Sequence, residues 1–219
     1  MRGKRTKKNT AKVFWEFYGS QDVPSDDVTY LSIDPGYVDL PVYYGRRTSQ
    51  CLTTYDLRLF SFKKSPRLFE RLTRVLSEHF ARCYEHRPFD IVLIEKQLDV
   101  SRLPKVVSHV LFGILAKDYP QVGVYFLSSR IKTANRQSHE SKDPKLCSIE
   151  RSIRWCKIFH DHRSLKRIRS ATKGRRDDYA DVITQAQAFF EILGRFADPE
   201  YYQHQYFDGF GSEYRDRND

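Results

Sequence analysis

The chain has 219 residues, 40% hydrophobic and 30% charged, with 38 Lys and Arg against 28 Asp and Glu and a net charge of +10. This composition is typical of one globular domain and excludes disordered or fibrous chains. The sequence has no long apolar run and no signal peptide, which predicts an intracellular protein without a membrane span. The positive charge favours a polyanionic partner, nucleic acid before an acidic membrane surface; a solvated basic surface is the alternative.

The N-terminal part of the chain divides into a basic arm and three strands. Residues 1–12 carry six bases and no acid, and we interpret residues 1–26 as a basic N-terminal arm. Apolar, β-prone residues then favour a first strand that ends at Asp34, where Pro35-Gly36 breaks it. Two further segments, 40–47 and 51–62, follow, and the alternation in 51–62 is that of a half-buried strand. The three strands predict an antiparallel meander.

Helices and strands alternate through the rest of the predicted domain, which spans residues 27–195. Ser65-Pro66 is typical of a helix start, and Glu95 ends an apolar run of the kind found in central strands. The expected elements are a helix to about residue 80, a strand at 91–94, a helix at 104–118, a strand at 122–127, a long loop at 128–145, and helices at 147–160 and 177–193. Residues 166–176 are a basic stretch, and the tail at 196–219 has no pattern. The order predicts an α/β ribonuclease H-like fold with a mixed five-stranded sheet flanked by helices.

Acidic residues mark three of these elements. Asp34 ends the first strand, Glu95 ends the strand at 91–94, and an acid group opens the last helix. There Asp178 and Asp181 share a helical face at i, i+3, and Asp177 and Asp181 share one at i, i+4. Carboxylates from separate elements are what phosphodiester hydrolysis with two divalent metal ions requires.

Each acid also has an ordinary interpretation. Asp34 before Pro35-Gly36 is typical of a turn, Glu95 of a strand that leaves the core, and the aspartates of the last helix of capping residues. The four cysteines have no C-x-x-C spacing and favour reduced thiols over zinc ligands. Taken jointly, at these elements in a basic chain, the acids favour a metal-dependent nuclease.

The motifs SIDPG, VLIEKQ and KGRRDDYADV resemble those of RuvC-like Holliday junction resolvases, and among them the branch of poxviruses, other large DNA viruses and fungal mitochondria. The resemblance covers residues 28–193. It implies a ribonuclease H-like homodimer that makes paired symmetrical nicks in four-way DNA junctions with magnesium. It also makes the helix at 104–118 the expected dimer element, although the apolar stripe of this helix fits an ordinary core equally well. The implied location is a viral replication site, a nucleus or a mitochondrion, which the sequence does not distinguish.

The resemblance also assigns site residues. Asp34, Glu95, Asp178 and Asp181 are the expected catalytic residues and ligands of two Mg²⁺ ions, with Mn²⁺ as a possible substitute and Asp177 in reserve. In the mechanism that this resemblance implies, one ion would activate the attacking water and the other would stabilise the leaving 3′-oxygen, which would give 5′-phosphates. Arg176 stands where relatives often have lysine, which leaves the role of Lys173 open. The bases expected to contact DNA phosphates are Lys132, Arg136, Lys142, Lys173, Arg175 and Arg176.

Three alternatives stay open. A non-catalytic module that binds branched DNA has the same charge, and other ribonuclease H-like nucleases or transposases share the metal acids. An actin-like ATPase also has a D-x-G turn after a strand. It requires in addition a second glycine-rich phosphate loop, and neither Gly174 nor Gly194 lies in such a motif.

Overall fold

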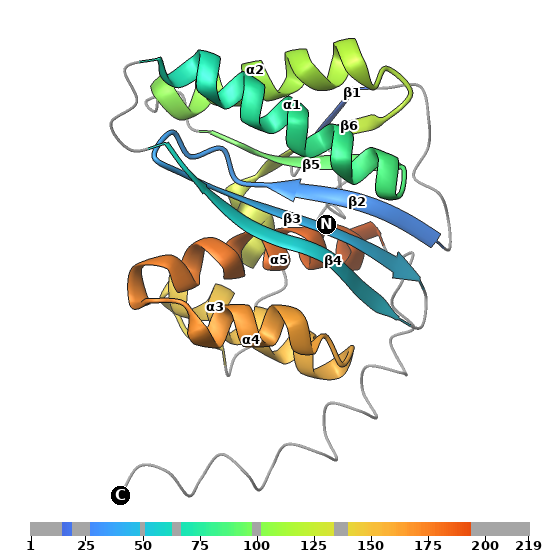
Figure 1. Ribbon diagram of the computed structural model, residues 1–219. Helices are drawn as coiled ribbons and strands as arrows, with labels where there is room; N and C mark the ends of the chain where they lie inside the picture. Colours follow the sequence, from blue (N-terminus) through green and yellow to red (C-terminus); the bar gives the residue numbers. More distant parts are fainter. Residues whose placement is uncertain are drawn as a thin grey trace, which may run out of the picture.

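The central strand of the sheet is β2 (Asp27–Ile33), the strand that ends immediately before Asp34. In the computed structural model, which describes residues 15–18, 27–48, 51–62, 67–97, 102–133 and 140–193, β2 pairs antiparallel with β3 (Asp39–Thr48), and β3 pairs antiparallel with β4 (Leu52–Ser61). On its other side β2 is parallel to β5 (Ile91–Lys96), and β5 is parallel to β6 (Gly123–Ser128). The predicted meander and central strand are therefore confirmed, and Figure 1 shows the mixed sheet they form.

Over the residues that the structure describes, the sheet has six strands rather than the expected five, in the order β1-β6-β5-β2-β3-β4. The additional strand, β1 (Trp15–Tyr18), comes from the range interpreted as a basic arm and pairs antiparallel with β6. Four residues are too few to show a strand period. Aromatic packing stabilises β1 instead: the ring centroid of Phe17 lies 4.6 Å from that of Tyr125, and that of Tyr18 lies 5.2 Å from that of Phe112.

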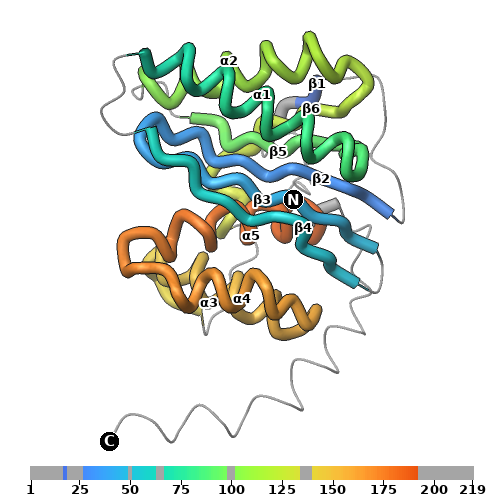
Figure 2. Tube along the Cα trace, viewed as in Figure 1, coloured from blue at the N-terminus to red at the C-terminus, as the bar shows by residue number. Residues whose placement is uncertain are grey.

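Helices cover both faces of the sheet (Figures 1 and 2). One face carries α1 (Leu68–His86) and α2 (Arg102–Asp118). The other carries α3 (Pro144–Ile158), α4 (His162–Ser170) and α5 (Lys173–Leu193). The expected cap at Ser65-Pro66, most of the N-terminal arm and the C-terminal tail lie outside the described residues.

Two segments differ from the expected elements. The basic stretch at 166–176 contains the second half of α4 and the first turn of α5. The sequence did not indicate α4 because Leu165 and Ile168 are its only large apolar residues and give no visible period. The predicted loop at 128–145 begins with a short 3₁₀ helix, η2 (Ser129–Thr133). Because α5 starts at Lys173, the acidic residues of its motif lie one turn inside the helix rather than at its first turn.

Alternate residues of the central strands face two separate cores. Val28, Tyr30 and Leu93 pack on the side of α5, whereas Leu31 and Ile33 pack on the side of α1 and α2. Helix α5 lies between the sheet and α3, and its residues 182–190 are all buried. Because α5 is covered on several sides, polar residues of this helix also lie inside the protein. Its acids are thereby brought close to the sheet.

The free edge of β4 is covered by side chains from α4. Arg163 Nη1 donates a hydrogen bond to the carbonyl of Tyr55 at 2.6 Å, and Arg167 Nε donates to that of Leu57 at 3.4 Å. Unpaired carbonyls at a sheet edge invite pairing with another chain, so these arginines protect the edge. Among the helices described, none is long and apolar enough to cross a bilayer.

Candidate active site

The strand register brings Asp34 and Glu95 together. Ile33 of β2 lies beside Ile94 of the parallel strand β5, so the residues that follow them are also neighbours. Side chains alternate along a strand, and Asp34 follows the direction of Tyr30 and Ser32 while Glu95 follows that of Leu93. Both carboxylates therefore lie at the carboxyl end of the sheet, on the face that α5 covers.

Asp181 of α5 and Lys132 of η2 complete the cluster. The Lys132 ammonium lies 2.6 Å from Glu95 Oε2, 3.0 Å from Asp181 Oδ2 and 3.9 Å from Asp34 Oδ2. We predicted that Lys132 contacts DNA phosphates at the surface. The structure instead places this side chain inside the protein, where it is 9% exposed. Its ammonium lies at the point where carboxylates from three elements converge.

Burial and mutual repulsion disfavour the ionised form of these acids. Burial raises the pKa of Glu95 to about 7 and also raises the pKa of Asp34, and the Lys132 ammonium opposes both shifts. Burial acts to lower the pKa of Lys132, but the surrounding carboxylates outweigh it and raise that pKa above its usual value. The cluster is therefore one in which added positive charge is favourable.

Asp178 and Asp177 have different electrostatic surroundings. Burial raises the pKa of Asp178 to about 6, and the negative charges of Asp177, Asp39, Asp34 and Asp181 add to the shift in that order. Asp177 is instead paired with Lys145 of α3, whose ammonium lies 2.6 Å from its Oδ2 atom. The two adjacent aspartates thus have different surroundings.

Two motif residues support Asp34. Gln97, the last residue of VLIEKQ, donates from Nε2 to Asp34 Oδ1 at 3.3 Å. Gly36 lies in a turn in which a Cβ atom would be 1.8 Å from the carbonyl oxygen of Asp39, so no other residue fits without a shift of the backbone. The glycine is required by this close approach.

Gln185, one turn beyond Asp181 on α5, links the elements that carry the acids. Its Nε2 atom donates to Ser32 Oγ at 3.1 Å and to the carbonyls of Leu93 and Ile33 at 3.2 and 3.4 Å. Ser32 Oγ in turn donates to the carbonyl of Val182 at 2.7 Å. Sequence reasoning missed this residue, although a glutamine within the apolar stripe of a helix was a visible signal.

Replacement of Gln185 by methionine is expected to destabilise the protein by about 1–2 kcal/mol, because buried acceptors on two strands lose their donor. The free energy of unfolding in urea measures the effect. Gln121→Met is the matched control, since the Gln121 side chain is exposed and bonds only the hydroxyl of Tyr84 among the described residues. Equal stability of the two variants would contradict the assigned role.

The donor set fits a hard divalent cation. Asp34, Glu95 and Asp181 present carboxylate oxygens, which Mg²⁺ prefers, to a single ammonium, and Asp178 adds a negative charge nearby. Among the described residues no three acid, His or Cys side chains form a closed ligand set, and the ammonium of Lys132 lies close to Glu95 and Asp181. A divalent cation at this place would compete with that ammonium.

The other bases expected to contact DNA differ in their exposure to solvent. Lys142, Lys173 and Arg175 are exposed, and Arg176 is half-buried near the start of α5. Arg136 lies outside the described residues. The exposed bases at the start of α5 are on the segment that leads to Asp178, so they flank the acidic cluster in the chain.

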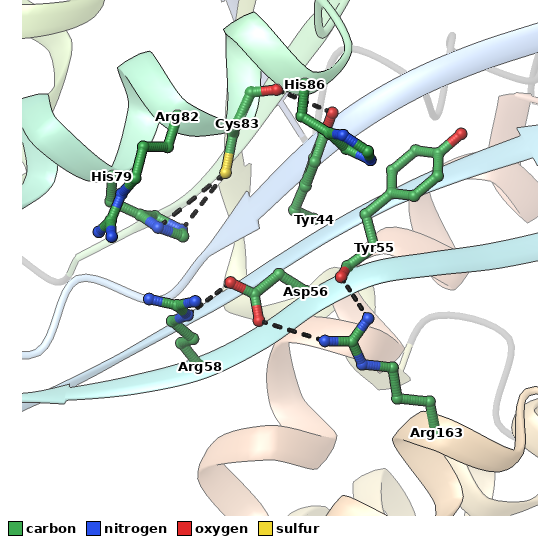
Figure 3. A pocket seen from close by; sticks show the side chains of 9 residues that line it. All are labelled: Tyr44, Tyr55, Asp56, Arg58, His79, Arg82, Cys83, His86 and Arg163. Atoms are coloured by element: carbon green, nitrogen blue, oxygen red, sulfur yellow. Dashed lines mark hydrogen bonds and ion pairs between the residues drawn. The ribbon is translucent and has the colours of Figure 1, made fainter.

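A separate cavity of about 200 Å³ lies at the β4 edge, between α1 and β4 (Figure 3). It is lined by arginines and by His79 and Cys83, and no acid of the cluster contributes to it. Burial lowers the pKa of His79 to about 4 and raises that of Cys83 to about 12. At neutral pH neither side chain is charged, so this cavity lacks an activated thiol.

No protein-family model and no curated protein sequence matches the chain. Solved structures do match it. RuvC of Thermus thermophilus in complex with a Holliday junction substrate has a TM-score of 0.54 at 14% identity, over 76% of this chain and 96% of that one. The fowlpox virus resolvase in complex with Holliday junction DNA gives 0.50 at 14% identity, over 75% and 98%, and the yeast mitochondrial Holliday junction resolvase gives 0.54 at 10%, over 83% and 86%. The chain therefore has the ribonuclease H-like fold of these proteins.

Proposed function

We propose that this chain is a RuvC-like resolvase that cleaves four-way DNA junctions with divalent metal ions. The observation that carries the proposal is the convergence of Asp34, Glu95 and Asp181 on one cation position, at the carboxyl end of the central parallel strands. Three proteins with the same fold are RuvC in complex with a Holliday junction substrate, the fowlpox virus resolvase in complex with Holliday junction DNA, and the yeast mitochondrial Holliday junction resolvase. The chain's net charge of +10 also suits a DNA partner.

In this proposal some side chains are metal ligands, and others position those ligands or balance their charge. Asp34, Glu95, Asp178 and Asp181 hold two Mg²⁺ ions, which would supply activation of water and stabilisation of the leaving oxygen when bound. Gln97 orients Asp34, and Gln185 keeps the strand ends aligned with α5. Lys132 balances part of the negative charge of the carboxylates.

A synthetic four-way junction tests the function. We expect paired symmetrical nicks with 5′-phosphates that depend on added Mg²⁺ and stop in EDTA. Linear duplex and an RNA–DNA hybrid are the comparison substrates, because another ribonuclease H-like nuclease would prefer one of them. Binding of junctions without cleavage under all metal conditions would favour the non-catalytic module instead.

A homodimer is part of the proposal, since symmetrical nicks need two active sites. The exposed side chains of Leu103 and Val106 at the start of α2 favour this helix as the dimer element. Analytical ultracentrifugation of the wild type and of Leu103→Lys/Val106→Lys tests it. We expect the variant to be monomeric and to lose paired nicking, and a variant that stays dimeric would rule out this element.

Neutralising Lys173 and Arg175 is expected to weaken junction binding and to lower its salt dependence. Each lost phosphate contact should reduce the slope of log affinity against log salt by about 0.9, so Lys173→Gln/Arg175→Gln should lower it by about 2. Fluorescence anisotropy at several salt concentrations measures the slope. Arg71→Gln/Arg74→Gln removes two exposed bases from α1, on the opposite face of the sheet, and should leave the slope unchanged.

A further inference from the structure

Arg151 of α3 is the centre of a buried charged network that adjoins the acidic cluster. Its side chain is 5% exposed, and its Nη1 atom donates to the backbone carbonyl of Lys132 at 2.7 Å. Its Nη2 atom donates to Glu191 Oε2 at 2.9 Å, and its Nε atom lies 3.9 Å from Glu140 Oε1. A buried guanidinium is costly unless close partners satisfy it, and these partners come from three separate parts of the chain.

The network joins η2 to the helix that carries Asp181. Glu191 is on α5, and Glu140 precedes α3 and also binds Arg154 Nη1 at 3.0 Å. Arg151 therefore holds the backbone of Lys132 in a constant place relative to α5. This restraint matters because η2 has only five residues, and short 3₁₀ helices have poor hydrogen-bond geometry of their own.

We propose that Arg151 is a positioning residue, which holds the carbonyl of Lys132 and so sets where its ammonium lies among Asp34, Glu95 and Asp181. The inference rests on the proposed function to the extent that these carboxylates hold a divalent cation. The ammonium and such a cation are attracted to the same oxygens. A less firmly held ammonium competes less well, so loss of Arg151 raises the affinity of the carboxylates for the cation.

Binding of Mn²⁺ to the full chain without DNA tests the proposal, with free Mn²⁺ measured by electron paramagnetic resonance. Lys132→Met should bind Mn²⁺ about tenfold more tightly than the wild type, because a positive charge beside the site is removed, and Arg151→Met about threefold more tightly. In the double variant, Arg151→Met should add nothing to Lys132→Met. Arg154→Met is the matched control, because Arg154 contacts Glu140 and, within the described part of the chain, does not bond Lys132. This variant should bind Mn²⁺ as the wild type does.

The comparison of Arg151→Met in the presence and absence of Lys132 separates a positioning role of Arg151 from a general structural role. A general structural role would change Mn²⁺ affinity equally with or without Lys132. Wild-type affinity in Arg151→Met, or independent effects in the double variant, overturns the positioning role alone. Absence of Mn²⁺ binding in every variant overturns both this role and the metal-dependent function. Thermal unfolding reports whether Arg151→Met folds; if it does not, Glu191→Gln, which removes one anchor of Arg151, should tighten Mn²⁺ binding about twofold, and no tightening rejects the proposal.

Discussion

Asp34→Asn is expected to abolish junction cleavage, with a loss of at least about a thousandfold in rate, while junction affinity stays close to that of the wild type. Asp34 is a neighbour of Glu95 and, with Asp181, faces the Lys132 ammonium. A neutral amide at this position removes a charged oxygen ligand without changing the shape of the site. Single-turnover cleavage of a four-way junction in Mg²⁺ measures the rate, and anisotropy in Ca²⁺ or EDTA measures binding.

The control for this variant is Asp90→Asn. Asp90 lies at the opposite end of the same strand pair, where its Oδ2 atom accepts from the backbone nitrogen of Thr29 at 2.8 Å. Its replacement changes the same residue type in the same sheet but not the acidic cluster. Cleavage by Asp34→Asn at a wild-type rate would show that the assigned cation site is wrong.

Glu95→Gln is expected to end cleavage and at the same time to stabilise the metal-free protein at pH 8 by on the order of 1–3 kcal/mol. Burial raises the pKa of Glu95 from its usual 4.5 to about 7. The folded protein therefore keeps this proton to higher pH than the unfolded chain does. The contribution of Glu95 to stability is full below pH 4.5 and is lost as the pH rises through 7, and the glutamine avoids this loss.

Thermal and urea unfolding of the two proteins at pH 5 and pH 8, in EDTA and in Mg²⁺, measures this effect. In EDTA the advantage of Glu95→Gln should be large at pH 8 and small at pH 5. Added Mg²⁺ should stabilise the wild type much more than the variant, because only the wild type retains all four carboxylates. A variant that is less stable than the wild type at pH 8 in EDTA would contradict the raised pKa.

Much of the architecture was accessible from the sequence because its signals are local. The apolar run before Glu95 and the break after Asp34 identify strands and their ends, and strand alternation then predicts which face each carboxylate occupies. β1 was missed because aromatic contacts with distant residues stabilise it. α4 was missed because it has only two large apolar side chains among many bases, and two residues are too few to show a helical period.

The site was less accessible, because neighbouring residues of one type differ only in their tertiary partners. The motif resemblance favours Asp178 over Asp177 as a ligand but does not show what either side chain contacts, and the structure adds that Asp177 forms an ion pair with Lys145. A lysine in a polar stretch can contact a phosphate or an internal carboxylate, and its positive charge is the same in both cases. Only the fold shows that Lys132 points into the protein.

The arginines over β4 also restrict how copies of this protein can assemble. With the carbonyls of Tyr55 and Leu57 engaged by α4, a second chain cannot extend the sheet across that border without first displacing Arg163 and Arg167. Growth of ordered polymers by strand addition at that side is thereby opposed. Copies of this protein that meet at the β4 side would have to do so through the side chains of α4 rather than by strand pairing.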